Sequence, residues 1–403
     1  MSAEYTNGGR YHALDAVRGG ALFLGVALHT TLGYMAPHIW IVNDTAVEPG
    51  LGVMFFTIHM FRMSLFFLLA GFFARLLYQR YGAKAFAMNR LKRIAMPLAV
   101  FWTPVLAIII TLLIMAALKA NPELASKPAA PPPPLTAETF PLTHLWFLYV
   151  LLILYAVFVP LRGLFAFIDR GGSLRRAVDV VFGLAIKSGL SPLVFGLPLF
   201  LILMAQPQTW MYWFGIPTPD KGLAPNVVAL VAFGSAFGVG WLLHRNVGLL
   251  ETIKKQWLTG IVSAIGFTAY CLWSEGIVPK FDMASYPAQM LYAAAYVSGI
   301  WAWCLGLTGL ALRFWDRPNP FWRYVADSSY WVYIVHLPLL LVLQYLALDL
   351  DWPAEAKFSL VVIGTIFISL ATYQLLVRYS FIGTILNGKR MKPARAKLKA
   401  QTI

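Results

Sequence analysis

The sequence predicts an all-α integral membrane protein with about ten transmembrane helices and both termini cytoplasmic. Three observations support this fold class. Hydrophobic residues make up 59% of the 403 residues and charged residues only 12%, about half the charged share of an average soluble domain. Ten apolar runs each approach or exceed the roughly 20 residues that cross a bilayer. Lysine and arginine gather in alternate connections between these runs.

The apolar runs follow one another along the whole chain. They are 14–35, 51–77, 94–118, 142–160, 190–205, 227–243, 257–273, 291–312, 330–346 and 358–377. The first run contains Arg18 and His29 and has no small-residue cleavage site after it, so we expect a permanent helix rather than a signal peptide. Residues 175–187 form an amphipathic pattern that predicts a helix lying flat at the membrane surface.

The basic residues set the predicted topology. By our count 25 of them lie at the N-terminal end, in the even-numbered connections and in the tail. The other connections hold only Lys119, Lys127, Lys221, Lys280 and Lys357. The positive-inside rule then places both termini in the cytoplasm. Because membrane topology accounts for the net charge of +15, that charge does not indicate nucleic-acid binding.

Other features exclude several classes of protein. Cys271 and Cys304 lie within apolar runs, which predicts buried side chains and neither a disulfide framework nor a metal site. There is no internal repeat and no phosphate-binding Gly-Lys-Ser/Thr loop, so an ATP-driven engine is not expected. Pro131–Pro134 form a stiff spacer in an outer connection. Residues 1–385 are predicted to form one polytopic membrane domain and residues 386–403 a basic cytoplasmic tail.

Polar side chains within the first run are the first functional signal. Arg18 and His29 are eleven residues apart, which on a helix returns to within roughly 20° of the same face and about 16 Å along the axis. Asp15 precedes Arg18 by three residues, so the two can pair. Charged groups at bilayer depth cost at least about 2–3 kcal/mol each. The pattern fits either a functional stripe or a buried ion pair with a hydrogen-bonded core histidine.

The second run adds His59 and Arg62, which the same helical rise places near the level of His29. A neutral imidazole at this depth can act as a general base. His144 and Trp146 open the fourth run, where an interfacial aromatic belt is the alternative explanation. In the ninth run, His336 follows Tyr333, and a hydrogen bond between helices is the simpler interpretation.

A further group of arginines lies at the predicted cytoplasmic side of the membrane. Arg75 lies near the end of the second run, and Arg90 and Arg93 follow that run. Positively charged residues at this position are usually explained by topology alone. The alternative is a cradle for the phosphates of a ligand that arrives from the cytosol.

Together these blocks resemble the acyltransferase-3 family of membrane acyltransferases. The resemblance rests on Leu14–Gly19 with His29, on Phe61–Phe67 with Ala70–Phe73, on Arg90–Arg93, on His144–Leu148 and on Ser328–His336. Within that family the chain is most similar to the branch that succinylates osmoregulated periplasmic glucans. The resemblance implies a membrane-bound O-acyltransferase in a bacterial inner membrane. Its co-substrate would be cytosolic acyl-CoA, most simply succinyl-CoA, and its acceptor a periplasmic glycan hydroxyl. No permanent cofactor and no metal are expected.

The pattern and the resemblance give one hypothesis for the site. In it, His29 takes the proton of the acceptor hydroxyl, His59 and Arg62 assist the reacting groups, and Asp15 holds Arg18, which orients the donor. The arginines Arg75, Arg90 and Arg93 bind the phosphates of the acyl-CoA. The acceptor is bound by His144, Trp146, Tyr333 and His336.

Several alternatives stay open at the level of sequence. The protein could O-acetylate another envelope glycan, and the transfer could pass through a covalent acyl-enzyme. A secondary transporter or flippase would also bury charged side chains along a pathway. A purely structural subunit would leave the polar stripe without explanation. The sequence does not determine the oligomeric state.

Overall fold

The computed structural model describes residues 11–126, 134–207, 210–281 and 288–387. Arg10, Lys127, Pro131–Pro133 and residues 388–403 of the predicted tail lie outside the described residues. Within them the chain is helical, and strand pairing is limited to one isolated bridge between Pro141 and Lys221. The predicted all-α class is confirmed.

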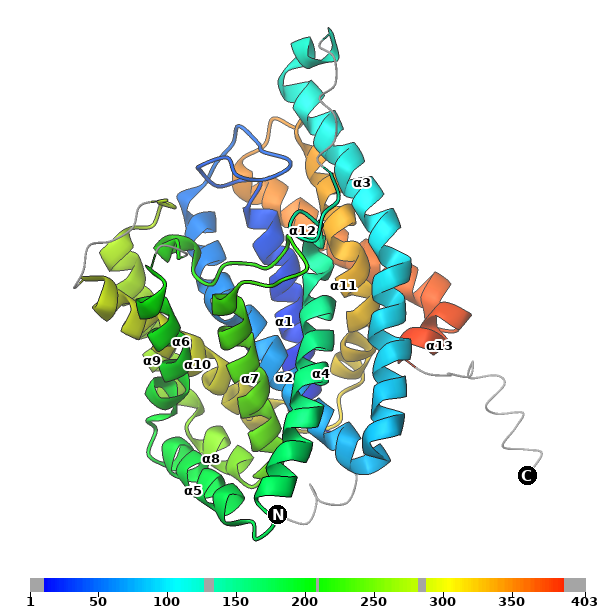
Figure 1. Cartoon of the computed structure of the whole chain (residues 1–403). Coiled ribbons are helices and arrows are strands. Elements are labelled where there is room, and N and C mark those ends of the chain that lie inside the picture. Colours follow the sequence, from blue (N-terminus) through cyan, green and yellow to red (C-terminus); the bar gives the residue numbers. More distant parts are fainter. Residues whose placement is uncertain (1–10, 127–133, 208–209, 282–287, 388–403) are drawn as a thin grey trace.

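The helices are arranged as a bundle (Figure 1). In chain order they are α1 (His12–Thr31), α2 (Pro49–Arg90), η1 (Leu91–Ala95), α3 (Met96–Ala120), η2 (Pro122–Ser126), η3 (Thr143–Leu145), α4 (Trp146–Ile168), α5 (Ser173–Lys187), α6 (Ser191–Ala205), η5 (Tyr212–Phe214), α7 (Val227–Arg245), α8 (Leu249–Lys255), α9 (Trp257–Glu275), α10 (Ala288–Phe314), α11 (Pro320–Ala347), α12 (Ala354–Thr372), η6 (Tyr373–Val377) and α13 (Phe381–Asn387). α13 includes residues 386 and 387, which the sequence had assigned to the tail.

Each predicted apolar run lies largely within one of these helices, but the number of ten spans stays a prediction. Among the described residues, seven helical segments are long and apolar enough to cross a membrane. One of them, Pro49–Ala120, contains both α2 and α3. The bent pair α5 and α6, at 114°, would make an eighth span. α1 is not among the seven, because its polar side chains lower its mean hydropathy.

Local sequence explains where the main helices begin. Glu48 accepts a hydrogen bond from the Gly50 N–H and Pro49 occupies the first turn of α2. Asn319 caps α11 in the same way, with Pro320 after it. α2 is kinked at Gly82, whose φ of 76° suits a residue without a Cβ. Beyond this kink the chain turns, and α3 returns along the bundle (Figure 1).

Close helix packing depends on small residues. At Gly71 of α2 an added Cβ would collide with the carbonyl of Phe237 on α7, and at Gly240 of α7 with the carbonyl of Leu68. Since lipid supplies no hydrophobic drive between helices, such close backbone approach is a main source of association. This contact holds α7 directly against α2.

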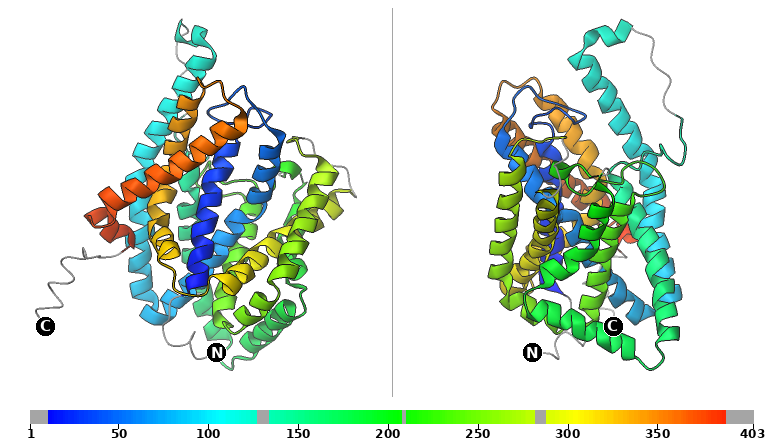
Figure 2. Two further views of the ribbon diagram at one scale, coloured as in Figure 1. Left: turned by 180° about the vertical axis from the view of Figure 1, so that it is seen from behind. Right: turned by 60° about the vertical axis from the view of Figure 1, so that its left-hand side comes forward.

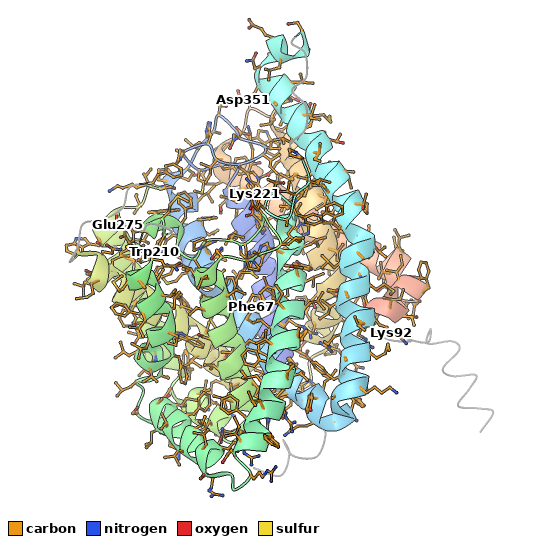
Figure 3. The ribbon with its side chains drawn as sticks, viewed as in Figure 1. Phe67, Lys92, Trp210, Lys221, Glu275 and Asp351 are labelled. Atoms are coloured by element: carbon orange, nitrogen blue, oxygen red, sulfur yellow. The ribbon has the colours of Figure 1, made fainter. Side chains whose placement is uncertain are left out.

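The two ends of the bundle differ in charge. The lower end in Figure 1 contains the turn between α2 and α3, the connection from α4 to α5, and α8; we call it the basic end. The opposite end contains the loop from α1 to α2 and the connection from α11 to α12, as the further views agree (Figure 2). In Figure 3 Lys92 lies below Lys221 and Glu275. Connections rich in basic residues and connections poor in them therefore lie at opposite ends of the bundle.

Candidate functional site

A cavity of about 390 Å³ lies between α1, α2, α4 and α11, with η1, η3 and α13 also contributing. It is lined by nine of the twelve residues that the sequence predicted for the site. These are Arg18, His29, Arg62, Arg90, Arg93, His144, Trp146, Tyr333 and His336. Residues from both ends and the middle of the chain thus face one space. The arrangement forms the candidate site.

The charged side chains that line the cavity are all positive. Four arginines line the cavity, and among the described residues that line it there is no aspartate or glutamate. A cavity with such an excess of guanidinium groups suits an anionic ligand, because guanidinium binds phosphate and carboxylate oxygens in pairs. The described residues contain no group of three or more His, Cys, Asp or Glu side chains that could hold a metal ion.

Three histidines form a cluster in the cavity. The ring centroid of His336 lies 5.5 Å from that of His29 and 5.1 Å from that of His144. They come from α11, α1 and η3, so three separate segments converge here. Tyr333 is one helical turn before His336, and its hydroxyl donates to the carbonyl of His144 at 2.6 Å. This bond ties the start of α4 to α11.

A proline in α11 explains how His144 is held. Pro338 has no N–H, so it cannot bond the carbonyl of Ile334 four residues earlier. Nε2 of His144 lies 3.1 Å from that carbonyl and bonds it instead. Nδ1 of His336 lies 2.7 Å from the carbonyl of Tyr333. Backbone carbonyls of one helix therefore orient two imidazole rings.

Arg62 brings a buried positive charge to the same region. Its side chain comes from α2, and the residue is only 8% exposed. A Cβ at Gly25 of α1 would lie 2.5 Å from Nη1 of Arg62, so the glycine provides the space for the guanidinium. Gly25 is one turn before His29. Nε of Arg62 has no hydrogen-bond partner among the described residues.

At the basic end three of the lining arginines have different surroundings. Arg18 lies 3.3 Å from the carboxylate of Asp15 and donates to the carbonyl of Ala326 at 2.8 Å. Arg90 lies over the ring of Tyr155, 5.4 Å from its centroid. Arg93 lies in η1, a π-helical turn, and such turns are frequent at functional sites. Arg90 also donates to Oδ1 of Asn89 at 2.7 Å. The buried Nε atoms of Arg18 and Arg90 have no hydrogen-bond partner among the described residues.

Trp40 covers His29 on one side. It belongs to the loop between α1 and α2, and its ring stacks on the imidazole with centroids 5.8 Å apart and planes 17° apart. Its Nε1 donates to Gln344 of α11 at 3.0 Å, and Gln344 donates to the carbonyl of Thr30 at 3.0 Å. Gln344 thus links α11 to the end of α1 and to the loop above it.

Three predicted residues do not line the cavity. Asp15 lies behind it, paired with Arg18. His59 stacks on Phe55 of its own helix, with centroids 5.1 Å apart, a turn beyond the end of the cavity. Arg75 projects from another face of α2, with its guanidinium 5.9 Å from the ring centroid of Trp241. It is two residues after the lining residue Phe73, which on a helix is a rotation of about 200°.

Other lining residues were not predicted. Tyr155 follows Leu148 and Leu151 at helical spacing on α4, and all three line the cavity. This spacing could have identified Tyr155 as part of the face that begins with His144. Ser329 and Asn387 add hydroxyl and amide groups near the basic end. Asn387 carries no sequence signal, because it lies outside the apolar runs.

Comparison with known proteins adds independent findings. Residues 11–374 match the acyltransferase-3 family, described as an acyltransferase domain. Glucans biosynthesis protein C of Salmonella schwarzengrund (strain CVM19633) is 24% identical over 342 residues, covering 82% of this chain and 83% of that protein. Its namesake in Shigella dysenteriae serotype 1 (strain Sd197) is 24% identical over 401 residues, or 94% and 95%. No solved structure matches. The resemblance predicted from the sequence is confirmed.

Proposed function

Because the chain belongs to the acyltransferase-3 family, we propose that it transfers an acyl group from cytosolic acyl-CoA to a hydroxyl of a periplasmic glycan. The names of the relatives support a glucan as the acceptor. Succinyl is the proposed acyl group, as the sequence resemblance implies. The protein would reside in the bacterial inner membrane, with its basic end and both termini in the cytoplasm.

One observation carries this proposal. A single cavity has arginines at the basic end and a histidine cluster further in, and its lining holds no carboxylate among the described residues. The phosphates of a CoA ester would engage Arg90 and Arg93, while Arg18 orients the donor. The thioester would then reach the imidazoles, where the glycan hydroxyl must lose its proton.

Acyl transfer also requires stabilisation of the negative charge that develops on the thioester oxygen, and Arg62 is positioned for this role. Attack on the thioester carbonyl develops negative charge on its oxygen, and fixed donors in a water-poor site stabilise that charge strongly. Arg62 is buried, lies against α1 one turn from His29, and has an unpartnered Nε–H among the described residues. His59, which stacks outside the cavity, would act only through this helix.

The decisive experiment uses the purified full chain in lipid vesicles with succinyl-CoA or acetyl-CoA and a glucan acceptor. We expect release of free CoA thiol that depends on the acceptor, with succinyl preferred, and mass spectrometry of the glucan identifies the group added. His29→Ala, confirmed to insert normally, should lose most of this activity. A transporter or flippase would move the glycan without releasing thiol, and that outcome would refute the proposal.

A further inference from the structure

The hydrogen bonds of the cavity histidines determine which ring nitrogen can act as a base. A carbonyl oxygen only accepts, so a ring nitrogen bonded to it carries the hydrogen. In His336 the bonded atom is Nδ1, facing the carbonyl of Tyr333 at 2.7 Å. The lone pair of the neutral ring is then on Nε2. In His144 the bonded atom is Nε2, at 3.1 Å from the carbonyl of Ile334, and the lone pair is on Nδ1.

The three imidazole rings also differ in the burial and the hydrogen-bond partners of their nitrogens. Nδ1 of His144, which carries its lone pair, is fully buried and has no partner among the described residues. Nδ1 of His29 is also buried without a partner there, so nothing described orients that ring through this atom. His336 alone of the three lining histidines combines a backbone-oriented ring with a basic nitrogen that no described group occupies and that is not sealed from the cavity.

We propose that His336 is the general base, accepting the proton of the acceptor hydroxyl at Nε2 while the carbonyl of Tyr333 holds its ring. The proposal rests on the proposed function and assigns to His336 the step that the sequence assigned to His29. An imidazole oriented at one nitrogen and basic at the other is the arrangement that activates hydroxyl nucleophiles in unrelated enzymes. His29, 5.5 Å away between the rings of Trp40 and His336, then positions the acceptor.

The proposed step involves the acceptor hydroxyl, the thioester and the imidazole of His336. The hydroxyl proton moves to Nε2 of His336 as its oxygen bonds the thioester carbonyl carbon, giving a tetrahedral oxyanion near Arg62. The oxyanion reforms the carbonyl and the carbon–sulfur bond breaks. The thiolate takes the proton from the imidazolium of His336, which leaves the ester, the free thiol and the neutral base. No other reactant is needed.

The main test compares His336→Asn with His29→Gln in vesicles containing the full chain. In the His336→Asn variant the new side-chain amide can still donate to the Tyr333 carbonyl, but it offers no basic nitrogen. We expect turnover with succinyl-CoA and glucan to fall at least about a hundredfold, the usual contribution of a general base, with the KM for succinyl-CoA unchanged. Unfolding temperatures equal to that of the wild type would exclude a folding defect.

The pH profile distinguishes a base from a structural residue. The titratable groups around His336 are His29, Arg62, His144 and Tyr333, and His336→Asn leaves all four unsubstituted. Wild-type kcat/KM for the glucan should fall as pH decreases, because a protonated base cannot accept a proton. The residual activity of His336→Asn should lack this fall, while that of His29→Gln should keep it.

The outcomes separate the two proposals. If wild-type protein releases no thiol, the proposed function fails and the assignment of His336 fails with it. Suppose that the wild type is active and that His336→Asn retains more than about a tenth of its turnover, or still shows the fall of kcat/KM at low pH. Then only the assignment of His336 is overturned. If His29→Gln instead loses the fall of kcat/KM at low pH, His29 is the general base.

Discussion

Two buried cations in this bundle have opposite surroundings. Lys357 of α12 is 3% exposed, and its Nζ lies 2.8 and 3.0 Å from the two carboxylate oxygens of Asp44, which is equally buried. Arg62 of α2 is 8% exposed, yet no carboxylate of the described residues lies within ion-pair distance of it. A buried charge is costly unless it is paired. The paired lysine is thus a structural element, whereas under the proposed function the charge of the arginine stabilises the reacting groups.

The two regions are physically connected. Asp44 lies in the loop between α1 and α2, four residues after Trp40, which stacks on His29. Asn43 and Trp40 exchange two hydrogen bonds, at 3.1 and 2.7 Å. The ion pair to Lys357 therefore anchors the loop that covers one side of the histidine cluster. Stability in one region supports geometry in the other.

The largest expected effect comes from breaking the ion pair between Asp44 and Lys357. Lys357→Met leaves the carboxylate of Asp44 buried and uncompensated, which should lower the free energy of unfolding by about 3–5 kcal/mol. Chemical unfolding of the protein in detergent micelles would measure this. The double variant Asp44→Leu/Lys357→Met removes both charges and should recover most of the loss. If the single variant is as stable as the double, the pair has no structural role.

Arg62→Met should reduce activity without reducing stability, whereas Lys357→Met is expected to reduce stability. We expect turnover to fall by about 10²–10³, as when one oxyanion donor is removed. Stability should stay equal or rise, since a buried charge without a partner is replaced by an apolar side chain of similar length. Thiol release and unfolding, measured on the same preparation, give both values. A variant that unfolds more easily while keeping its turnover would show that Arg62 is structural.

The sequence predicted the positions of the helices better than it predicted which residues line the cavity. Each apolar run lies largely within one helix, because a segment removed from water must satisfy its backbone hydrogen bonds internally. The spacing of Arg18 and His29 predicted that they share one face of a helix, and both line the cavity. Depth along a helix, however, does not say which neighbour a side chain faces, so His59 and Arg75 were assigned to a cavity that they do not reach. The bond between His144 and Ile334 depends on tertiary contact and has no local signal.

A smaller effect is expected at the basic end. Replacing both Arg90 and Arg93 by Gln removes their charges but keeps neutral amide donors, so only part of the about 1.5–3 kcal/mol of each charged hydrogen bond is lost. We expect the KM for succinyl-CoA to rise at least about tenfold, while kcat changes little because the histidine cluster is intact. Arg75→Gln is the matched control, since this arginine belongs to the same basic segment but lies outside the cavity. An equal rise in KM for the control would mean that general surface charge attracts the donor.

The smallest change tests the contact between the unpaired cation and α1. Gly25→Ala places a Cβ 2.5 Å from Nη1 of Arg62, so the guanidinium must shift away from its position beside α1. Turnover should fall several-fold, while the helix gains about 0.5–1 kcal/mol because alanine restricts the unfolded chain more than glycine. Gly20→Ala, where nothing lies within 4 Å of the added Cβ, should give the same stability gain with unchanged turnover. If the two variants are equally active, the position of Arg62 against α1 is not what the chemistry requires.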